Sequence, residues 1–314
     1  DGHDTINVGS TTSGADGIAA LLTINGDGNG AGDTLNVDDS GNSVGKVGTL
    51  TESNVSGLFG AGGHIEYDTL EVLNIALGSS GDTFTVHSTH LATTTVDTGG
   101  GNDTVYVQSV SGPARIDTDT GDDTIHVLSV DADTELKAGA GRDTINLSNI
   151  AADTTVDAGA GDDTINVQSI AAATTVNAGD GDDTINVGSE APGAGGNLNG
   201  IAARLTINGD GNVGGDVLNV DDSGDGTDNT GWLDATTIAG LFGTAGSITY
   251  GMLEALNVRL GSGSDVFAIE GTHAGRTTLD TDGGNDTVNV QNVSGPTTID
   301  TGADDDTIDV WNTE

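Results

Sequence analysis

Short alternations of apolar and polar residues recur along this chain at a constant pitch. In Thr164-Ile-Asn-Val, the alternation predicts a strand that turns Ile165 and Val167 inward and Thr164 and Asn166 outward. A second strand, Thr174-Thr-Val-Asn-Ala178, follows after a corner. The same phases return about every 20 residues, a period typical of an all-β parallel β-solenoid (β-helix or β-roll) with loop insertions. The expected core columns are Val105, Ile125, Ile145, Ile165 and Ile185; Val107, Val127, Leu147, Val167 and Val187; and Val110, Val130, Ile150 and Ile170.

A longer repeat lies over the short one. Residues 1–10 match residues 180–189, and Thr23-Ile-Asn-Gly-Asp-Gly-Asn matches the run that begins at Thr206. We therefore expect a first module, 1–179, and a second, incomplete copy, 180–314, in one continuous solenoid. Because the second copy stops early and the chain opens on Asp1, we expect a processed or excised piece of a protein with more modules. Two longer segments per module, 11–22 with 190–204 and 41–66 with 224–249, are expected to be loops that bulge from the coils.

The charge balance is strongly acidic and changes what the pattern implies. The chain has 49 acidic and 7 basic residues, a net charge of -42, and only 3% aromatic residues. That composition alone favours disorder, so we expect bound cations to neutralise the carboxylates before the chain compacts. Self-repulsion of this size argues against nucleic acid as a partner, and no apolar run is long enough for membrane insertion. The absence of cysteine excludes disulfides and zinc–thiolate sites.

The acidic positions fall in a glycine-rich loop before each strand. In Gly179-Asp-Gly-Asp-Asp-Thr, glycines permit positive φ angles that let carbonyl oxygens converge, and Asp183 closes the turn. In a parallel solenoid the next loop lies about 4.8 Å away, where two bare carboxylates repel by roughly 3 to 4 kcal/mol. A cation between the two carboxylates turns this repulsion into attraction. Since all the ligands are hard oxygens, Ca²⁺ is favoured over Mg²⁺.

These loops resemble the calcium-binding nonapeptide of the RTX family, Gly-Gly-x-Gly-x-Asp-x-apolar-x. Ala178-Gly-Asp-Gly-Asp-Asp-Thr-Ile-Asn fits all but the first glycine, as do the runs that begin at Thr98 and Ala158. The resemblance implies multiple Ca²⁺ ions and secretion through a dedicated export channel. It implies metal ligands at Asp4, Asp33, Asp82, Asp103, Asp123, Asp143, Asp163, Asp183, Asp216, Asp265, Asp286 and Asp306. The residues beside them, Asn102, Asp122, Asp162, Asp182, Asn285 and Asp305, complete the predicted set.

The match to the RTX pattern is incomplete. One acidic loop alternates with a metal-poor half in each coil, so the implied metal column is one-sided. Arg142 stands beside Asp143, Asp304 replaces a motif glycine, and the loops before Asp33 and Asp216 are three residues longer. We expect weak or empty sites there.

Several alternatives stay open. The Asp-Thr loops are also good turn formers without metal. The repeated pairs Asp38-Asp39 and Asp221-Asp222 form either an extra cation site or a solvated turn, and we favour the turn. His87 and His90 are expected on an exposed strand edge. Catalysis is not expected, because a polysaccharide-cleaving β-helix needs one unique cluster of acids with a basic residue, whereas here the basic residues are scattered: Lys46, Arg115, Lys137, Arg142, Arg204, Arg259 and Arg276.

The sequence thus favours a calcium-binding structural repeat segment of an extracellular surface, adhesin or filament-forming bacterial protein, and not an enzyme. Calcium would drive folding and rigidity, and exposed coil ends would allow head-to-tail self-association into fibres. One alternative is a glycan- or protein-binding region that uses the insertions at 41–66 and 224–249. Another is an ice-binding face built from outward Thr and Asn columns, such as Thr164 and Asn166.

Overall fold

The chain folds as an all-β parallel solenoid, as the sequence predicts. The computed structural model describes residues 2–26, 32–209 and 215–311, and these contain 29 strands and no helix. They form two compact units: unit 1 holds residues 1–145 and 150–159, and unit 2 holds residues 146–149 and 160–314. The boundary divides strands β14 (Thr144–Leu147) and β15 (Thr154–Ala160).

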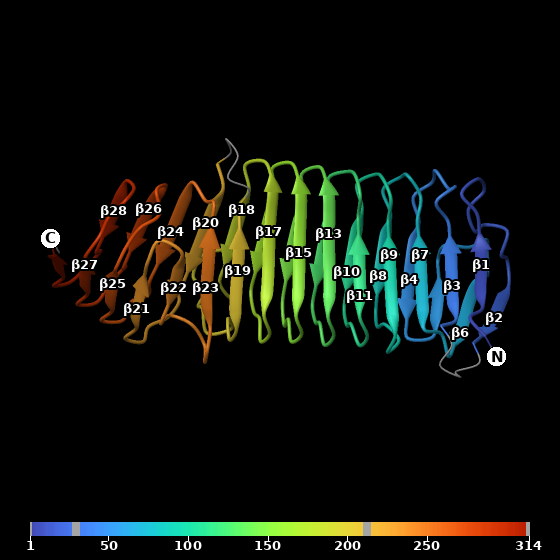
Figure 1. The fold of residues 1–314 in the computed structure, drawn as a ribbon, viewed down its shortest axis with the longest axis horizontal. Coiled ribbons are helices and arrows are strands. Elements are labelled where there is room, and N and C mark those ends of the chain that lie inside the picture. The colour runs from blue at the N-terminus through green and yellow to red at the C-terminus, as the bar shows by residue number, and fades with distance from the viewer. Residues whose placement is uncertain (1, 27–31, 210–214, 312–314) are drawn as a thin grey trace. The chain divides into compact units, whose positions relative to one another are not determined.

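Unit 1 consists of two sheets whose strands alternate along the chain (Figure 1, blue to green). Sheet A contains, in spatial order, β1 (Thr5–Gly9), β3 (Thr34–Asp38), β7 (Val72–Ala76), β9 (Thr93–Asp97), β11 (Ala114–Asp117), β13 (Thr134–Ala140) and β15. Sheet B contains β2 (Leu21–Asn25), β6 (His64–Asp68), β5 (Asn54–Ser56), β4 (Val47–Thr51), β8 (Thr83–Val86), β10 (Thr104–Val107) and β12 (Thr124–Val127).

Unit 2 repeats this plan: its strands again alternate between two sheets, whose parts within this unit are called sheets C and D. Sheet C contains β16 (Thr164–Val167), β18 (Thr184–Val187), β20 (Val217–Asp221), β24 (Ala255–Arg259), β26 (Arg276–Asp280) and β28 (Thr297–Asp300). Sheet D contains β17 (Thr174–Asp180), β19 (Arg204–Asn208), β23 (Ser247–Gly251), β22 (Thr237–Ala239), β21 (Thr230–Leu233), β25 (Val266–Ile269), β27 (Thr287–Val290) and β29 (Thr307–Val310).

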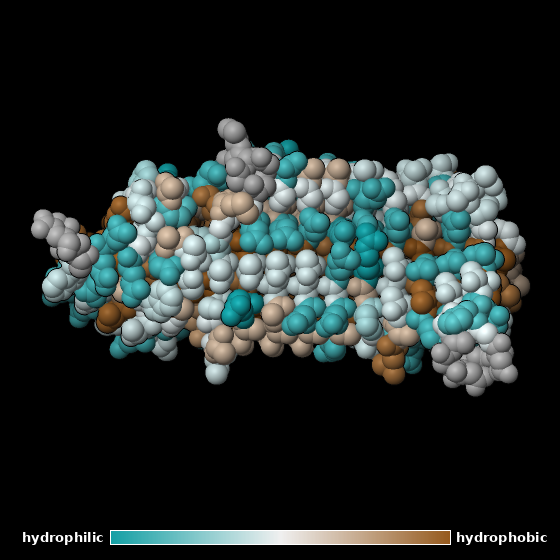
Figure 2. Space-filling model, in the orientation of Figure 1, coloured by the Kyte–Doolittle hydropathy of each residue, from teal (hydrophilic) through white to brown (hydrophobic). Residues whose placement is uncertain are grey.

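Like residues face like residues because the strands pair in parallel and in register. In sheet B, Val105 of β10 lies opposite Ile125 of β12, and Val107 lies opposite Val127. All members of the three predicted columns are at most 1% exposed, which confirms the core. The period-2 pattern therefore places aliphatic side chains between the two sheets of each unit and polar ones outside, and Figure 2 shows a largely hydrophilic face.

The segments 41–66 and 224–249 are not simple loops, so that prediction was wrong. In unit 1, β4 pairs antiparallel with β5 and β5 with β6, and three strands fill the place of one coil strand. In unit 2, β21, β22 and β23 do the same. The physical reason is burial: Leu50, Val55 and Ile65 are fully buried, and the Tyr67 hydroxyl donates a 2.6 Å hydrogen bond to the carbonyl oxygen of Thr51. Residues 11–17 form turns, as expected.

Candidate metal centre

The motif aspartates lie immediately before the strands and point into the protein. Ten of the twelve are at most 3% exposed: Asp33, Asp82, Asp103, Asp123, Asp143, Asp163, Asp183, Asp216, Asp265 and Asp286. Asp4 is exposed and Asp306 is half-buried, each at the outer end of its series. Buried carboxylates are unusual and require a partner.

In most of the buried aspartates, one carboxylate oxygen accepts a hydrogen bond from the backbone of the preceding coil. The N–H of Asp103, for example, donates to Oδ1 of Asp123 at 2.7 Å. We call these series the aspartate ladders. The donor and acceptor pairs are Asp4 to Asp33 (3.0 Å), Asp82 to Asp103 (2.7 Å), Asp123 to Asp143 (2.7 Å), Asp163 to Asp183 (2.8 Å), Asp183 to Asp216 (3.0 Å), Asp265 to Asp286 (2.8 Å) and Asp286 to Asp306 (3.0 Å).

The second oxygen is less well satisfied. The Oδ2 atoms of Asp82, Asp123, Asp265 and Asp286 are buried without a hydrogen-bond partner in the described part of the chain. In Asp103, by contrast, Oδ2 accepts a 2.5 Å hydrogen bond from the Thr98 hydroxyl. A buried oxygen without a donor is costly, and it is the atom that a cation would contact.

Burial of this kind disfavours the charged form. Desolvation raises the pKa of Asp103 to about 6 and the pKa of Asp123 to about 7, from an ordinary value of 3.8. It also raises the pKa of Asp82 and Asp265. The Thr118 hydroxyl partly offsets the rise at Asp123, but its own hydrogen bond goes to the carbonyl oxygen of Ala138 at 2.8 Å. Without a cation, these carboxylates oppose folding when ionised.

Each unit carries two ladders, so the expectation of a one-sided column was wrong. In unit 1, Asp4 and Asp33 precede strands of sheet A, whereas the series from Asp82 to Asp143 precedes β8, β10, β12 and β14. In unit 2, Asp183 precedes a strand of sheet C and Asp265 a strand of sheet D. Within a coil, the chain runs through the two sheets in opposite directions. The loops before sheet A strands and the loops before sheet B strands therefore lie at opposite edges of the coil stack.

Two glutamates extend ladders that sequence reasoning ended too early. Oε2 of Glu71 accepts the N–H of Asp33 at 2.7 Å, and Oε2 of Glu254 accepts the N–H of Asp216 at 2.9 Å. The signal was present: Glu71-Val-Leu-Asn-Ile aligns with Asp33-Thr-Leu-Asn-Val, which places Glu71 at the aspartate phase. A longer side chain reaches the same backbone donor there.

The residues beside the ladder form a second, exposed series of hydrogen bonds that run in the opposite direction: the later coil donates and the earlier coil accepts. Oδ1 of Asn102 accepts the N–H of Asp122 at 3.0 Å, and Oδ1 of Asp122 accepts the N–H of Arg142 at 2.9 Å. In unit 2, Asp162 and Asn285 likewise accept the backbone N–H groups of Asp182 and Asp305, at 3.2 and 3.0 Å. Each loop is thus tied by its two side chains to both neighbouring coils.

Coil stacking requires the motif glycines independently of any metal. A Cβ on Gly121 would lie 1.9 Å from the carbonyl oxygen of Gly101, and one on Gly141 would lie 1.7 Å from that of Gly121. The carbonyl oxygens of Thr120 and Ala140 already accept N–H groups of Gly101 and Gly121. A cation at the ladder would therefore take its oxygens from the carboxylates and only from loop carbonyls not used in this way.

The loops with Arg142 and Asp304, which match the RTX pattern poorly, still make some of the hydrogen bonds of the other loops. Backbone contacts tie Arg142 into the exposed series, and Asp304 adopts a φ of 84° in place of the missing glycine. Oδ2 of Asp304 accepts the N–H of Gly284 at 3.3 Å. The extra residues before Asp33 and Asp216 lie outside the described residues.

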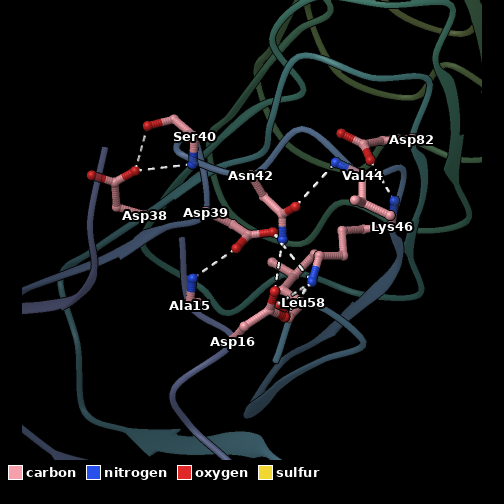
Figure 3. A network of polar contacts seen from close by, with 10 residues as sticks. All are labelled: Ala15, Asp16, Asp38, Asp39, Ser40, Asn42, Val44, Lys46, Leu58 and Asp82. Atoms are coloured by element: carbon pink, nitrogen blue, oxygen red, sulfur yellow. Dashed lines mark hydrogen bonds and ion pairs between the residues drawn. The ribbon is translucent and has the colours of Figure 1, made fainter. Parts of the chain in front are cut away.

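The turn prediction for the repeated Asp-Asp pairs holds for the first residue of each pair, because Asp38 and Asp221 accept the N–H groups of Ser40 and Ser223, but it is wrong for the second residue. Asp39 and Asp222 are fully buried, and each accepts a backbone N–H through Oδ1, from Ala15 at 2.7 Å and from Leu198 at 2.9 Å. Desolvation raises the pKa of Asp39 and raises that of Asp222 to about 7. The long segments 11–17 and 190–198 fold over these carboxylates, which local sequence could not reveal. Figure 3 shows the corner around Asp39.

The histidines behave in two ways. His87 is exposed, as predicted, and its Nδ1 lies 2.8 Å from Oε1 of Gln108. His90 is instead half-buried, with its ring edge-on to Tyr67 at 5.9 Å, and desolvation lowers its pKa. His273 and Tyr250 repeat this contact in unit 2. The exposed-edge prediction for His90 was wrong because Tyr67 comes from the inserted strands.

No group of three or more His, Cys, Asp or Glu side chains suited to a metal ion occurs among the described residues. The ladders bring carboxylates together in a line rather than in a cluster. The described residues also contain no helix that could span a membrane. Comparison with models of protein families gave no match, and comparison with curated proteins gave none either.

Proposed function

We propose that this chain is a calcium-binding structural repeat segment of an extracellular surface, adhesin or filament-forming protein. The observation that carries the proposal is the repeated buried carboxylate whose second oxygen has no hydrogen-bond donor, as in Asp82, Asp123, Asp265 and Asp286. It occurs in both units of a chain with a net charge of -42. Cations at the ladders would turn a repulsive line of carboxylates into an attractive one.

The donor chemistry supports calcium over other metals. Carboxylate and carbonyl oxygens are hard ligands, and a flexible oxygen shell suits Ca²⁺ better than Mg²⁺, which keeps waters and an octahedral geometry. Binding requires ionised carboxylates held close together, a condition that the unfolded chain does not meet. Binding free energy is therefore folding free energy, and calcium would act as a folding switch.

The biological setting follows from that switch. Low calcium inside cells would leave the acidic chain loose, and higher calcium outside would compact and stiffen it. Together with the RTX resemblance, this favours a secreted bacterial protein whose work is mechanical, in which head-to-tail stacking of coil ends would build fibres. The parallel register of the coils supports stiffness, because each coil is hydrogen-bonded along its length to its neighbours.

Circular dichroism during a calcium titration tests the proposal directly. We expect cooperative gain of β signal with calcium, reversal by EGTA, and little effect of magnesium at equal concentration. Thermal unfolding in the same buffers should show a large calcium-dependent rise in Tm. A chain that is equally folded and equally heat-stable after exhaustive chelation would refute the calcium role.

A groove in unit 2 favours a second candidate function, binding of a polar glycan. It has a volume of about 280 Å³, and its lining includes Pro192, Asn219, Asn257, Arg259 and Asp280. It does not involve the insertion at 224–249, so a glycan site would lie elsewhere than the sequence suggested. Saturation-transfer NMR with neutral and acidic oligosaccharides, with Asn257→Ala as the test variant, would detect such binding.

The ice-binding alternative has weaker support. Asn166 is only 2% exposed, and its amide donates to Oδ1 of Asn146 at 2.9 Å. Asn186 continues the series to Asn166 at 2.9 Å. Amides that bond to one another along the stack are less available to an ice surface.

A further inference from the structure

The two modules carry the same buried corner with different charges around it. In module 1, Asp39 lies at the centre, and Asp16, Asn42 and Lys46 surround it (Figure 3). The equivalent positions of this corner in module 2 lie 183 residues later, the same shift that relates Thr23 to Thr206. There Asp222 is central, and Asn199, Asp225 and Asn229 replace the three neighbours.

In module 1 the cation of this corner is an ammonium group. Nζ of Lys46 lies 2.5 Å from Oδ1 of Asp16, 3.4 Å from the carbonyl oxygen of Leu58 and 3.9 Å from Oδ2 of Asp39. The Lys46 side chain is 13% exposed, and that of Asp39 is 0% exposed. Oδ2 of Asp39 is buried without a hydrogen-bond partner among the described residues, and the Lys46 ammonium is the positive charge beside it.

The backbone of the corner is the same in module 2. Leu198 donates to Asp222 as Ala15 donates to Asp39. The N–H of Asn229 donates to Oδ1 of Asp265 at 2.7 Å, as that of Lys46 donates to Oδ1 of Asp82 at 2.6 Å. Asn229 therefore stands where Lys46 stands, but it brings no positive charge.

The negative charge at the same time increases. Module 1 has Asp16, Asp39 and Lys46, a sum of -1, whereas module 2 has Asp222 and Asp225, a sum of -2. Both asparagine side chains, Asn199 and Asn229, hydrogen-bond to Asp225. Nδ2 of Asn229 also lies 3.3 Å from Oδ2 of the fully buried Asp222. Four oxygen-bearing side chains thus converge where module 1 holds an ammonium.

We infer that this corner of module 2 binds one divalent cation, most suitably Ca²⁺, in place of the lysine ammonium of module 1. Its ligands are the carboxylates of Asp222 and Asp225 and the amide oxygens of Asn199 and Asn229. A half-turn of the Asn229 amide about its terminal bond would present oxygen instead of nitrogen at this position. Hard oxygens of mixed charge suit Ca²⁺. The site uses other carboxylates than the aspartate ladders, although it adjoins one of them through the N–H of Asn229, which donates to Asp265.

Exchanging the two residues tests the inference in the full chain. Asn229→Lys supplies the ammonium and should lower the number of bound Ca²⁺ ions by one per chain, measured by equilibrium dialysis and elemental analysis. Lys46→Asn should raise the number by one. Asn292→Lys, an exposed position, adds the same charge elsewhere and should change nothing. Circular dichroism confirms that each variant is folded.

Asp225→Asn provides a second variant at a half-buried loop position, and it should also remove one ion. Equal calcium content in the native chain, Asn229→Lys and Asp225→Asn would overturn the inference. Failure of the ladders gives a different result: the native chain would then bind a single ion, and Asn229→Lys would bind none. Magnesium in place of calcium shows whether the corner selects the larger ion.

Discussion

Replacing Asp123 by asparagine should change stability in opposite directions with and without calcium. The substitution keeps an oxygen that can accept the N–H of Asp103 at 2.7 Å, and it removes the ionisable group whose Oδ2 is buried without a donor. The new amide can donate to the Thr118 hydroxyl, which lies beside it. The change therefore isolates the charge at one rung of the ladder.

The magnitude follows from the pKa. Ionising Asp123 at pH 8 works against a folded-state pKa of about 7 instead of 3.8. At about 1.4 kcal/mol per pH unit, the penalty has an upper limit of about 4 kcal/mol, and relaxation and water penetration reduce it to about 2 kcal/mol. In EGTA, Asp123→Asn should thus raise the free energy of unfolding by about 2 kcal/mol. For a unit of this size, the Tm should rise by about 4 to 8 °C.

In saturating calcium the same variant should be less stable than the native chain, because it lacks a charged ligand at that rung. Differential scanning calorimetry at pH 8, in EGTA and in calcium, measures both effects. Asp131→Asn is the matched control: it removes the same charge from an exposed turn and should shift neither Tm by more than about 1 °C. If Asp123→Asn lowers the free energy of unfolding in EGTA as much as in calcium, the reasoning is refuted. The carboxylate of Asp123 would then stabilise the fold without any metal.

Three further predictions follow from the ladders and the coil stacking. In EGTA, the free energy of unfolding should fall as the pH rises from about 4 to about 7. The reason is that the raised pKa values of Asp103 and Asp123 make the folded state bind protons more tightly than the unfolded state. Urea unfolding at several pH values measures this, and a rise in the free energy of unfolding over that range would contradict it. Glu71→Ala should cost about 1 to 3 kcal/mol in urea unfolding by leaving the N–H of Asp33 without its acceptor, whereas Glu66→Ala, on an exposed position of β6, should cost little. Gly121→Ala should prevent normal stacking of the coils, since its Cβ would lie 1.9 Å from the carbonyl oxygen of Gly101. Gly17→Ala is the control, because its Cβ would meet no atom within 4 Å. Equal expression and equal Tm of the two variants would show that stacking does not need the close contact at Gly121.

Local sequence was sufficient for the repeating coils. Period-2 alternation and the constant spacing predicted the inward columns, and Ile125, Ile145 and Ile165 are all fully buried. The buried aspartates were also found from their phase alone, although not their hydrogen bonds to the preceding coil. Where one coil resembles the next, the residue that completes each contact can be found in the sequence about 20 residues away.

The errors occur where the chain departs from that rule. The inserted strands, the burial of His90 against Tyr67 and the partners of Asp39 all depend on segments that have no counterpart one coil away. The second ladder of unit 1 begins beside the inserted strands: Lys46, which directly precedes β4, donates its N–H to Oδ1 of Asp82.

The amino-acid sequence by itself determined the all-β class, the coil period, the apolar columns and the acidic phase, because these are properties of a short pattern repeated against itself. Only the tertiary structure decided which carboxylate oxygens are buried, which edge each ladder occupies and which residue faces Asp222. Those features depend on distant segments folding over a carboxylate and removing water from it, and desolvation is a property of the packed molecule, not of the residue.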